Sequence, residues 1–223
     1  MHATALTHSP HIVRLGGVAS LGMALCYLSM YVIFFGLISV PAGLDTLGRI
    51  QYLQQNHLLF AISYSVGYLL FGVFLATTLQ ALQHALPDKN SALAGLAERF
   101  GGIWVMLMMA SGMTYLIGLD KVFQLFRIDP VQAQALYHSV WLITNALGGG
   151  IELVGGLWML LLSMAGLKQK WFPKALHLLG LLIGALGIMT VLHSLPYLKD
   201  AFGLLQLVWF SWLGVMLIRT EVE

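Results

Sequence analysis

Long apolar runs recur along almost the whole chain, and they constrain its fold more than any other feature. They cover residues 12–40, 57–84, 93–119, 137–165, 174–194 and 201–219. A helical run of about 20 residues crosses the roughly 30 Å hydrocarbon layer of a bilayer. A helix also satisfies its own backbone polar groups, which lipid cannot do. The sequence therefore predicts an all-α polytopic membrane helix bundle of six transmembrane helices, forming one domain over residues 1–223.

The composition agrees with this class and excludes one kind of partner. Of the 223 residues, 59% are hydrophobic and 9% are charged, whereas a soluble domain has about 25% charged residues. The net charge of +2 is spread along the chain without a dense basic segment, so nucleic acid is not an expected partner. The expected partners are the lipid bilayer and either another membrane protein or a second copy of this chain.

The distribution of basic residues predicts an orientation. An even number of spans places both termini on the same side, and basic residues favour the cytoplasmic side. On the terminal side lie Arg14, Lys89, Arg99, Lys168, Lys170, Lys174 and Arg219, and on the opposite side lie Arg49, Lys121, Arg127 and Lys199. This count predicts cytoplasmic termini.

Two of the three outer connections mix apolar and polar residues at roughly helical spacing. They cover residues 44–55 and 122–136, the second interrupted at Pro130. Such segments can lie along the membrane interface as connectors. The alternative is a lid over a cavity that opens outward.

The motif ELVGGLW, residues 152–158, places a carboxylate within the fourth apolar run. On a continuous helix, Glu152 would share one face with Asn145 and with glycines one turn away on both sides, namely Gly148, Gly149, Gly155 and Gly156. A carboxylate inside the bilayer is expected to face the bundle interior or a water-filled cavity, and glycines allow a close helix contact. We interpret Glu152 either as a ligand-binding or proton-exchanging group, or as a neutral carboxyl that joins two helices.

A near copy of this motif, ERFGGIW, occupies residues 98–104. Residues 94–113 and 148–167 share seven identities, among them both glutamates, both glycine pairs and both tryptophans. Consecutive spans cross in opposite directions, so a repeat of this kind would be inverted in topology, as in transporters. Glu98 is expected nearer the cytoplasmic interface, beside Arg99, where it can reach water.

The remaining candidates are scattered over other spans. Gln206 is a candidate partner for Glu152, and the stripe containing Gly180 and Gly184 is typical of a close helix contact. His57, His138 and His193 are all expected near the outer interface, where three histidines could hold a metal ion or a haem. Their sequence spacing fits no metal or haem motif, so no cofactor is predicted.

Two segments near the C-terminus carry a resemblance. The stretch FGLLQLVWFSWLGVMLIR, residues 202–219, and GGLWMLLLSMAGL, residues 155–167, followed by the short basic loop KQKWFPKALHLLGLLIGALG, resemble uncharacterised bacterial six-span membrane proteins grouped as domain of unknown function 4386. The resemblance implies a multi-pass protein of the bacterial inner membrane with six helices. It implies no activity and no site residues.

Three functions fit these observations. The first is a small-molecule or proton-linked binding or transport protein with a polar intramembrane site around Glu152, Asn145 and Gln206. The second is a non-catalytic accessory or assembly subunit that docks onto another membrane protein. The third is a membrane redox or lipid-modifying enzyme that uses the outer histidines. The sequence favours the first, and it favours a protein that is not an enzyme.

Overall fold

The computed structural model describes residues 10–88, 91–149, 152–192, 195 and 197–220, and this part of the chain is helical without a β-strand. The α-helices are α1 (Pro10–Tyr31), α2 (Thr46–Gln55), α3 (His57–Tyr64), α4 (Phe71–Ala85), α5 (Ala92–Phe126), α6 (Pro130–Thr144), α7 (Leu153–Gln169), α8 (Lys174–Met189) and α9 (Tyr197–Arg219). Three π-helical segments interrupt or extend them: η1 (Val32–Leu37), η2 (Ser65–Leu70) and η3 (Asn145–Gly149). The predicted all-helical class is confirmed.

In the described part of the chain, five helical stretches are long and apolar enough to cross a membrane. They are His11–Leu37, His57–Ala85, Ala92–Phe126, Pro130–Gln169 and Tyr197–Arg219. Among its described residues, the predicted fifth span, residues 174–194, is helical over Lys174–Met189. These 16 residues measure about 24 Å. The structure thus supports a multi-pass membrane bundle, while the helix of the predicted fifth span is shorter than the hydrocarbon layer.

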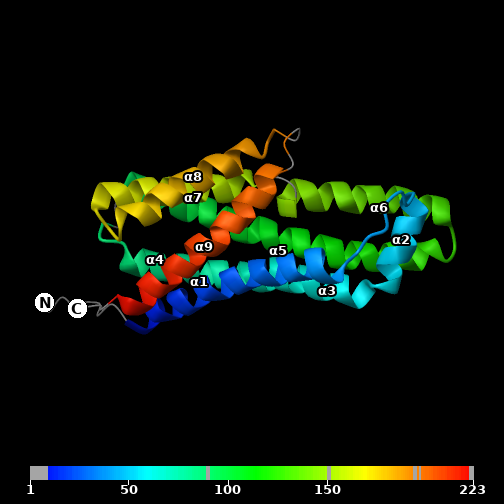
Figure 1. Cartoon of the computed structure of the whole chain (residues 1–223), viewed down its shortest axis with the longest axis horizontal. Coiled ribbons are helices and arrows are strands. Elements are labelled where there is room, and N and C mark those ends of the chain that lie inside the picture. Colours follow the sequence, from blue (N-terminus) through cyan, green and yellow to red (C-terminus); the bar gives the residue numbers. More distant parts are fainter. Residues whose placement is uncertain (1–9, 89–90, 150–151, 193–194, 196, 221–223) are drawn as a thin grey trace, which may run out of the picture.

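The bundle is elongated, and its helices run mostly along the long axis (Figure 1). The helix α5 extends along nearly the whole length, and α6 and α7 follow one another beside it. The start of α1 and the end of α9 lie together at one end, because Gly17 packs against Gly214 and Ile218. The helices α8 and α9 pack as an antiparallel pair, with Trp209 Nε1 donating a hydrogen bond to the Leu176 carbonyl at 3.0 Å.

The outer connection predicted over residues 122–136 is instead the end of one helix and the start of the next. The helix α5 continues to Phe126, and α6 begins at Pro130. The Asp129 carboxylate caps α6 by accepting hydrogen bonds from the backbone N–H groups of Val131 (3.1 Å) and Gln132 (3.0 Å). Proline is favoured in the first turn because it needs no hydrogen-bond acceptor there, so Pro130 starts a helix where we expected an interruption.

The other outer connection, residues 44–55, contains the ten-residue helix α2. The carboxylate of Asp45 caps it by accepting a hydrogen bond from the Gly48 backbone N–H at 2.8 Å. In Figure 1 this helix lies across the end of the bundle opposite the chain ends. Ile50 and Leu53 are buried there, so α2 covers this end of the bundle with its apolar side.

Two apolar clusters fill the bundle along its axis. The larger contains Phe71, Trp104, Trp158 and Phe210 and lies toward the chain ends. The smaller contains Ile50, Tyr115 and Tyr137 and lies toward α2. Outside them, large apolar side chains such as Met106 (67% exposed) face outward, as expected of helices surrounded by lipid.

Candidate functional site

The fourth predicted span is broken beside Glu152. The segment η3 ends at Gly149 and α7 begins at Leu153, with Glu152 at the position that precedes the helix. The expectation of one helical face shared by Asn145, Gly148 and Glu152 is therefore wrong. The physical reason is the run of three glycines at 148–150. Each glycine destabilises a helix by about 1 kcal/mol relative to alanine.

Side chains from neighbouring helices satisfy backbone groups on both sides of this break. The Thr190 hydroxyl accepts a hydrogen bond from the Glu152 backbone N–H at 2.8 Å and donates to the Gly187 carbonyl at 2.6 Å. On the other side, the Ser111 hydroxyl donates to the Thr144 carbonyl at 2.9 Å. Since an unsatisfied backbone group is costly in lipid, these contacts stabilise the break at a defined place.

The break lies about halfway across the apolar part of the bundle. The charged residues of α5 occur at its two ends, where Arg99 and Asp120 enclose 20 uncharged residues and lie about 32 Å apart along the helix. Gly148 lies against Met108, near the middle of this interval. Broken helices at this depth line binding sites in transporters, because irregular backbone is tolerated only where protein or a cavity surrounds it.

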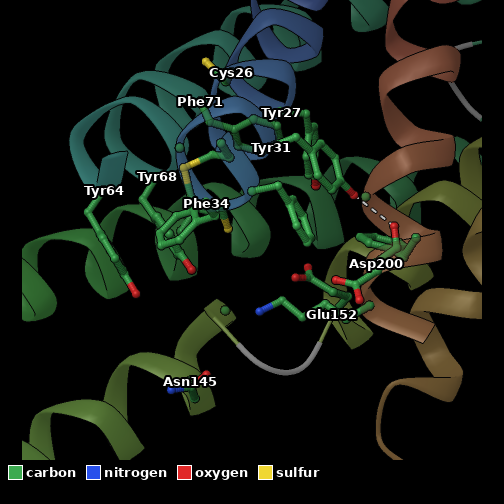
Figure 2. A pocket seen from close by; sticks show the side chains of 18 of the residues that line it. Cys26, Tyr27, Tyr31, Phe34, Tyr64, Tyr68, Phe71, Asn145, Glu152 and Asp200 are labelled. Atoms are coloured by element: carbon green, nitrogen blue, oxygen red, sulfur yellow. Dashed lines mark hydrogen bonds between the residues drawn. The ribbon is translucent and has the colours of Figure 1, made fainter. Parts of the chain in front are cut away.

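A cavity of about 350 Å³ lies at the break, and Glu152 faces it (Figure 2). Its walls come from α1, η1, α3, η2, α4, α5, α6, η3 and the start of α9. Each of the three π-helical segments contributes a wall residue, namely Phe34, Tyr68 and Asn145. Such segments are rare and occur often at functional sites, so their meeting at one cavity indicates a binding site.

Aromatic residues supply nearly half of the cavity wall. Nine of the 19 lining residues are aromatic: Tyr27, Tyr31, Phe34, Phe35, Tyr64, Tyr68, Phe71, Trp141 and Phe202. The rings of Tyr64 and Tyr68 are stacked with centroids 4.9 Å apart. Figure 2 shows these tyrosines on the side of the cavity opposite Glu152. The wall therefore offers many ring faces to a ligand, and it offers few charges.

The charged groups of the cavity gather on one side. The Glu152 side chain is 9% exposed, and among the described residues no group donates a hydrogen bond to its carboxylate. Lys199, at the exposed start of α9, interacts favourably with this carboxylate through space. Asp200 lies beside it, and its backbone carbonyl accepts a hydrogen bond from the Tyr31 hydroxyl at 2.9 Å.

The predicted ligand-binding residues occupy different positions around the cavity. Asn145 lines it, but its Nδ2 donates a hydrogen bond to the Trp141 carbonyl at 2.7 Å. Gln206 lies outside the wall, fully buried, where its Oε1 accepts a hydrogen bond from the Tyr27 hydroxyl. The Gln206 Nε2 group has no partner among the described residues. Glu152 therefore brings a charged group to the cavity wall, and its carboxylate accepts no hydrogen bond from a described residue.

The predicted packing glycines divide into two groups. Gly148 lines the cavity, and Gly149 ends η3. The other four lie at helix contacts: a Cβ atom on Gly155 would come 2.8 Å from Trp104, one on Gly156 would come 2.8 Å from the Gly184 oxygen, and one on Gly180 would come 2.0 Å from Ser163 Oγ. The backbones of α7 and α8 therefore touch at Gly156 and Gly184.

The outer histidines do not form a site in the described structure. His57 borders a small hollow beside Tyr115 and Asp120, and His138 Nε2 lies 3.5 Å from the Thr46 hydroxyl. His193 lies outside the described residues. In the part of the chain that the structure describes, no three His, Cys, Asp or Glu residues are grouped as metal ligands.

Sequence reasoning missed most of the residues that form this cavity. In the sequence, Lys199 is one of the basic residues on the outer side, and the tyrosines of α1 and η2 lie within apolar runs. They come from helices far apart in the chain, and no local motif connects them. The repeated glutamate motif was the one signal that pointed to this place.

Comparison with known proteins adds no assignment. No family model, no curated protein and no solved structure matches this chain. The resemblance to the six-span bacterial family stays a prediction.

Proposed function

We propose that this protein binds a small organic cation, such as a substituted amine or quaternary ammonium, in the cavity at the helix break. The observation that carries the proposal is the Glu152 carboxylate, which faces an aromatic cavity and accepts no hydrogen bond from a described residue. A buried carboxylate needs a counter-charge. A ligand that brings a positive charge into the cavity would supply it.

The aromatic wall supports the same ligand class. Ring faces attract cations, by up to about 2 kcal/mol when water is excluded. Aromatic walls also accept the apolar substituents of an organic cation, which a metal ion lacks. The cavity volume of about 350 Å³ is within the range of small-molecule sites.

Lys199 fits this proposal as the counter-charge of Glu152 before a ligand binds. Its positive charge attracts the Glu152 carboxylate through space, and it is exposed in the first turn of α9. A lysine side chain is long and flexible, so its ammonium group can withdraw toward solvent. A bound organic cation would then take its place beside Glu152.

The test is calorimetric titration of the purified protein in mild detergent with benzyltrimethylammonium as the probe. We expect binding of this cation and no binding of phenylmethanesulfonate, which has a similar shape and a negative charge. Glu152→Gln should weaken binding at least about 30-fold, since the loss of a buried charge partner costs roughly 2 kcal/mol or more. Asp120→Asn, which removes an exposed charge of α5 outside the cavity, should bind as wild type does.

Two outcomes would overturn the proposal. One is equal affinity of the Glu152→Gln variant and wild type, and the other is equal affinity of the two probes. If Glu152→Gln does not accumulate as a folded protein, Tyr68→Ala provides the second variant, since it removes a wall ring and keeps the carboxylate. Wild-type affinity in a folded Tyr68→Ala variant would exclude the aromatic contribution.

We also propose that the common end of α1 and α9 faces the cytoplasm of a bacterial cell. The excess of basic residues near this end supports this orientation. Fusions of a fluorescent protein or of alkaline phosphatase to the C-terminus test it. We expect fluorescence without phosphatase activity. Phosphatase activity without fluorescence would show that this end faces away from the cytoplasm.

A further inference from the structure

The two copies of the glutamate motif pack against each other in a reciprocal manner. A Cβ atom on Gly101 would lie 2.9 Å from Trp158 Cδ1, and one on Gly155 would lie 2.8 Å from Trp104 Cε2. Each tryptophan thus covers the first motif glycine of the other copy, and the two ring centroids are 5.5 Å apart. The tryptophan pair therefore forms the centre of the contact between the two motif copies.

This reciprocity relates the copies by a local two-fold rotation. The helices α5 and α7 are in contact and run in opposite directions (Figure 1). In each copy the glutamate precedes the tryptophan by six residues, or about 9 Å of helix. The two carboxylates therefore lie on opposite sides of the tryptophan pair along the bundle axis.

Each of the two glutamates lines a cavity of its own. Glu152 lines the cavity described above, and Glu98 lines a second one of about 250 Å³ nearer the chain ends. The walls of the second cavity come from α4, α5 and α7, and they include Gln83, Leu86, Ala97 and Trp158. Glu98 itself is exposed at its mouth, so this cavity opens toward the predicted cytoplasmic side.

A layer of buried aromatic rings separates the cavities. Phe71 lines the first cavity and Trp158 the second. Phe71 contacts Trp104 (centroids 5.5 Å apart) and Phe210 (6.0 Å), and both of these contact Trp158 (5.5 and 6.2 Å). All four side chains are at most 2% exposed, so the layer closes the route between the two carboxylates.

We propose that this layer is a gate and that the protein moves its organic cation between the Glu152 cavity and a second binding site at Glu98. This inference rests on the function proposed above. Because the two motif copies make equivalent contacts, a small rotation of α7 against α5 can exchange which side of the tryptophan pair is open. Inverted repeats provide alternating access in this way, and packed interfaces of this kind switch between discrete arrangements.

The direct contact of α7 with α8 is consistent with such a movement. At Gly156 and Gly184 the backbones of α7 and α8 are in direct contact, so the two helices can move together as one unit. The break that precedes Leu153 separates this unit from α6. The moving part would therefore carry Glu152 and Trp158 together.

Cysteine accessibility tests the gate. In a Cys26→Ala background, which removes the single native cysteine, Asn145→Cys reports on the first cavity and Gln83→Cys on the second. A membrane-impermeant anionic thiosulfonate is applied to vesicles of each orientation. We expect the two reporters to be modified from opposite sides, and saturating benzyltrimethylammonium should change their rates at least 3-fold in opposite directions.

Modification of both reporters from the same side would overturn the inference. Unchanged rates in a protein whose calorimetric binding is intact would also overturn the gate and leave the proposed binding function standing. Absence of calorimetric binding, in contrast, would contradict the proposed binding function itself. The two failures are therefore distinguishable.

Flux through proteoliposomes tests the second site. Uptake of radiolabelled benzyltrimethylammonium should fall at least 10-fold in Glu98→Gln and in Glu152→Gln, and Asp120→Asn should retain it. Wild-type uptake by Glu98→Gln would exclude the second site. No uptake by wild-type protein that binds the cation would exclude passage across the layer.

Discussion

Replacing one glycine of each motif copy by alanine should have opposite effects on stability. Gly156 and Gly102 occupy the same position of the repeated motif, but their surroundings differ. A Cβ atom on Gly156 would lie 2.7 Å from the Ile188 nitrogen and 2.8 Å from the Gly184 oxygen, both backbone atoms of the α7–α8 contact. At Gly102 no atom lies within 4 Å of the added carbon.

The magnitudes follow from these surroundings. Gly156→Ala forces α8 away from α7, and overpacking of this kind costs about 2–3 kcal/mol. Gly102→Ala adds a methyl group on an open helix face, and the better helix propensity of alanine contributes about 0.5–1 kcal/mol of stability. The two variants should therefore differ by roughly 3 kcal/mol in free energy of unfolding. For a chain of this length, that difference corresponds to roughly 6–12 °C in Tm.

Thermal unfolding in detergent, followed by fluorescence-detected size-exclusion chromatography, measures this difference. Gly184→Ala is a second probe of the same contact, because its Cβ atom would come 2.8 Å from the Leu160 nitrogen. We expect both α7–α8 variants to melt below wild type and Gly102→Ala to melt at or above it. Equal melting of Gly156→Ala and Gly102→Ala would refute the backbone contact between α7 and α8.

Three further substitutions test individual hydrogen bonds by the same melting assay. Thr190→Val removes the acceptor of the Glu152 backbone N–H and should cost about 1–3 kcal/mol; a wild-type Tm would show that this contact does not hold the break. Tyr27→Phe removes the donor to Gln206 and should cost about 1 kcal/mol of stability. The double variant Tyr27→Phe/Gln206→Leu should recover most of this loss, because both polar partners are then gone. Additive losses of the two substitutions would contradict the pairing. Asp129→Ala removes the cap of α6 and should cost about 1 kcal/mol, and an unchanged Tm would mean that Pro130 alone starts the helix.

The sequence predicted the helical class because the length of an apolar run alone decides whether a helix can cross lipid. It also pointed to Glu152, since a carboxylate in such a run requires a polar neighbourhood. It did not predict the break beside this residue. Glycines are tolerated in membrane helices, so three of them in succession leave both a continuous and a broken helix open, and the contacts from Thr190 and Ser111 favour the broken one.

The extent of the fifth helix and the roles of the two tryptophans also depended on tertiary contacts. The apolar run of residues 174–194 is long enough to cross lipid. However, α8 ends at Met189, and the next residue, Thr190, accepts a hydrogen bond from the Glu152 backbone N–H. In the sequence, Trp104 and Trp158 are equivalent positions of the repeated motif, but their contacts cannot be read from it. Their reciprocal contact with the motif glycines arises only because α5 and α7 pack in opposite directions.

By itself, the sequence determined that this chain is a membrane-type helix bundle, because hydrophobicity and helix length are local properties. It also determined that Glu152 requires a polar neighbourhood inside that bundle. Only the tertiary structure decided that Glu152 faces an aromatic cavity with Lys199 and Asp200 beside it. Lys199 and Asp200 come from α9, and aromatic wall residues come from α1 and η2. Their proximity to Glu152 depends on how the helices pack and on where α6 ends. The same packing places Glu98 in a second cavity beyond the tryptophan pair, because two similar motifs on antiparallel helices direct their carboxylates to opposite ends.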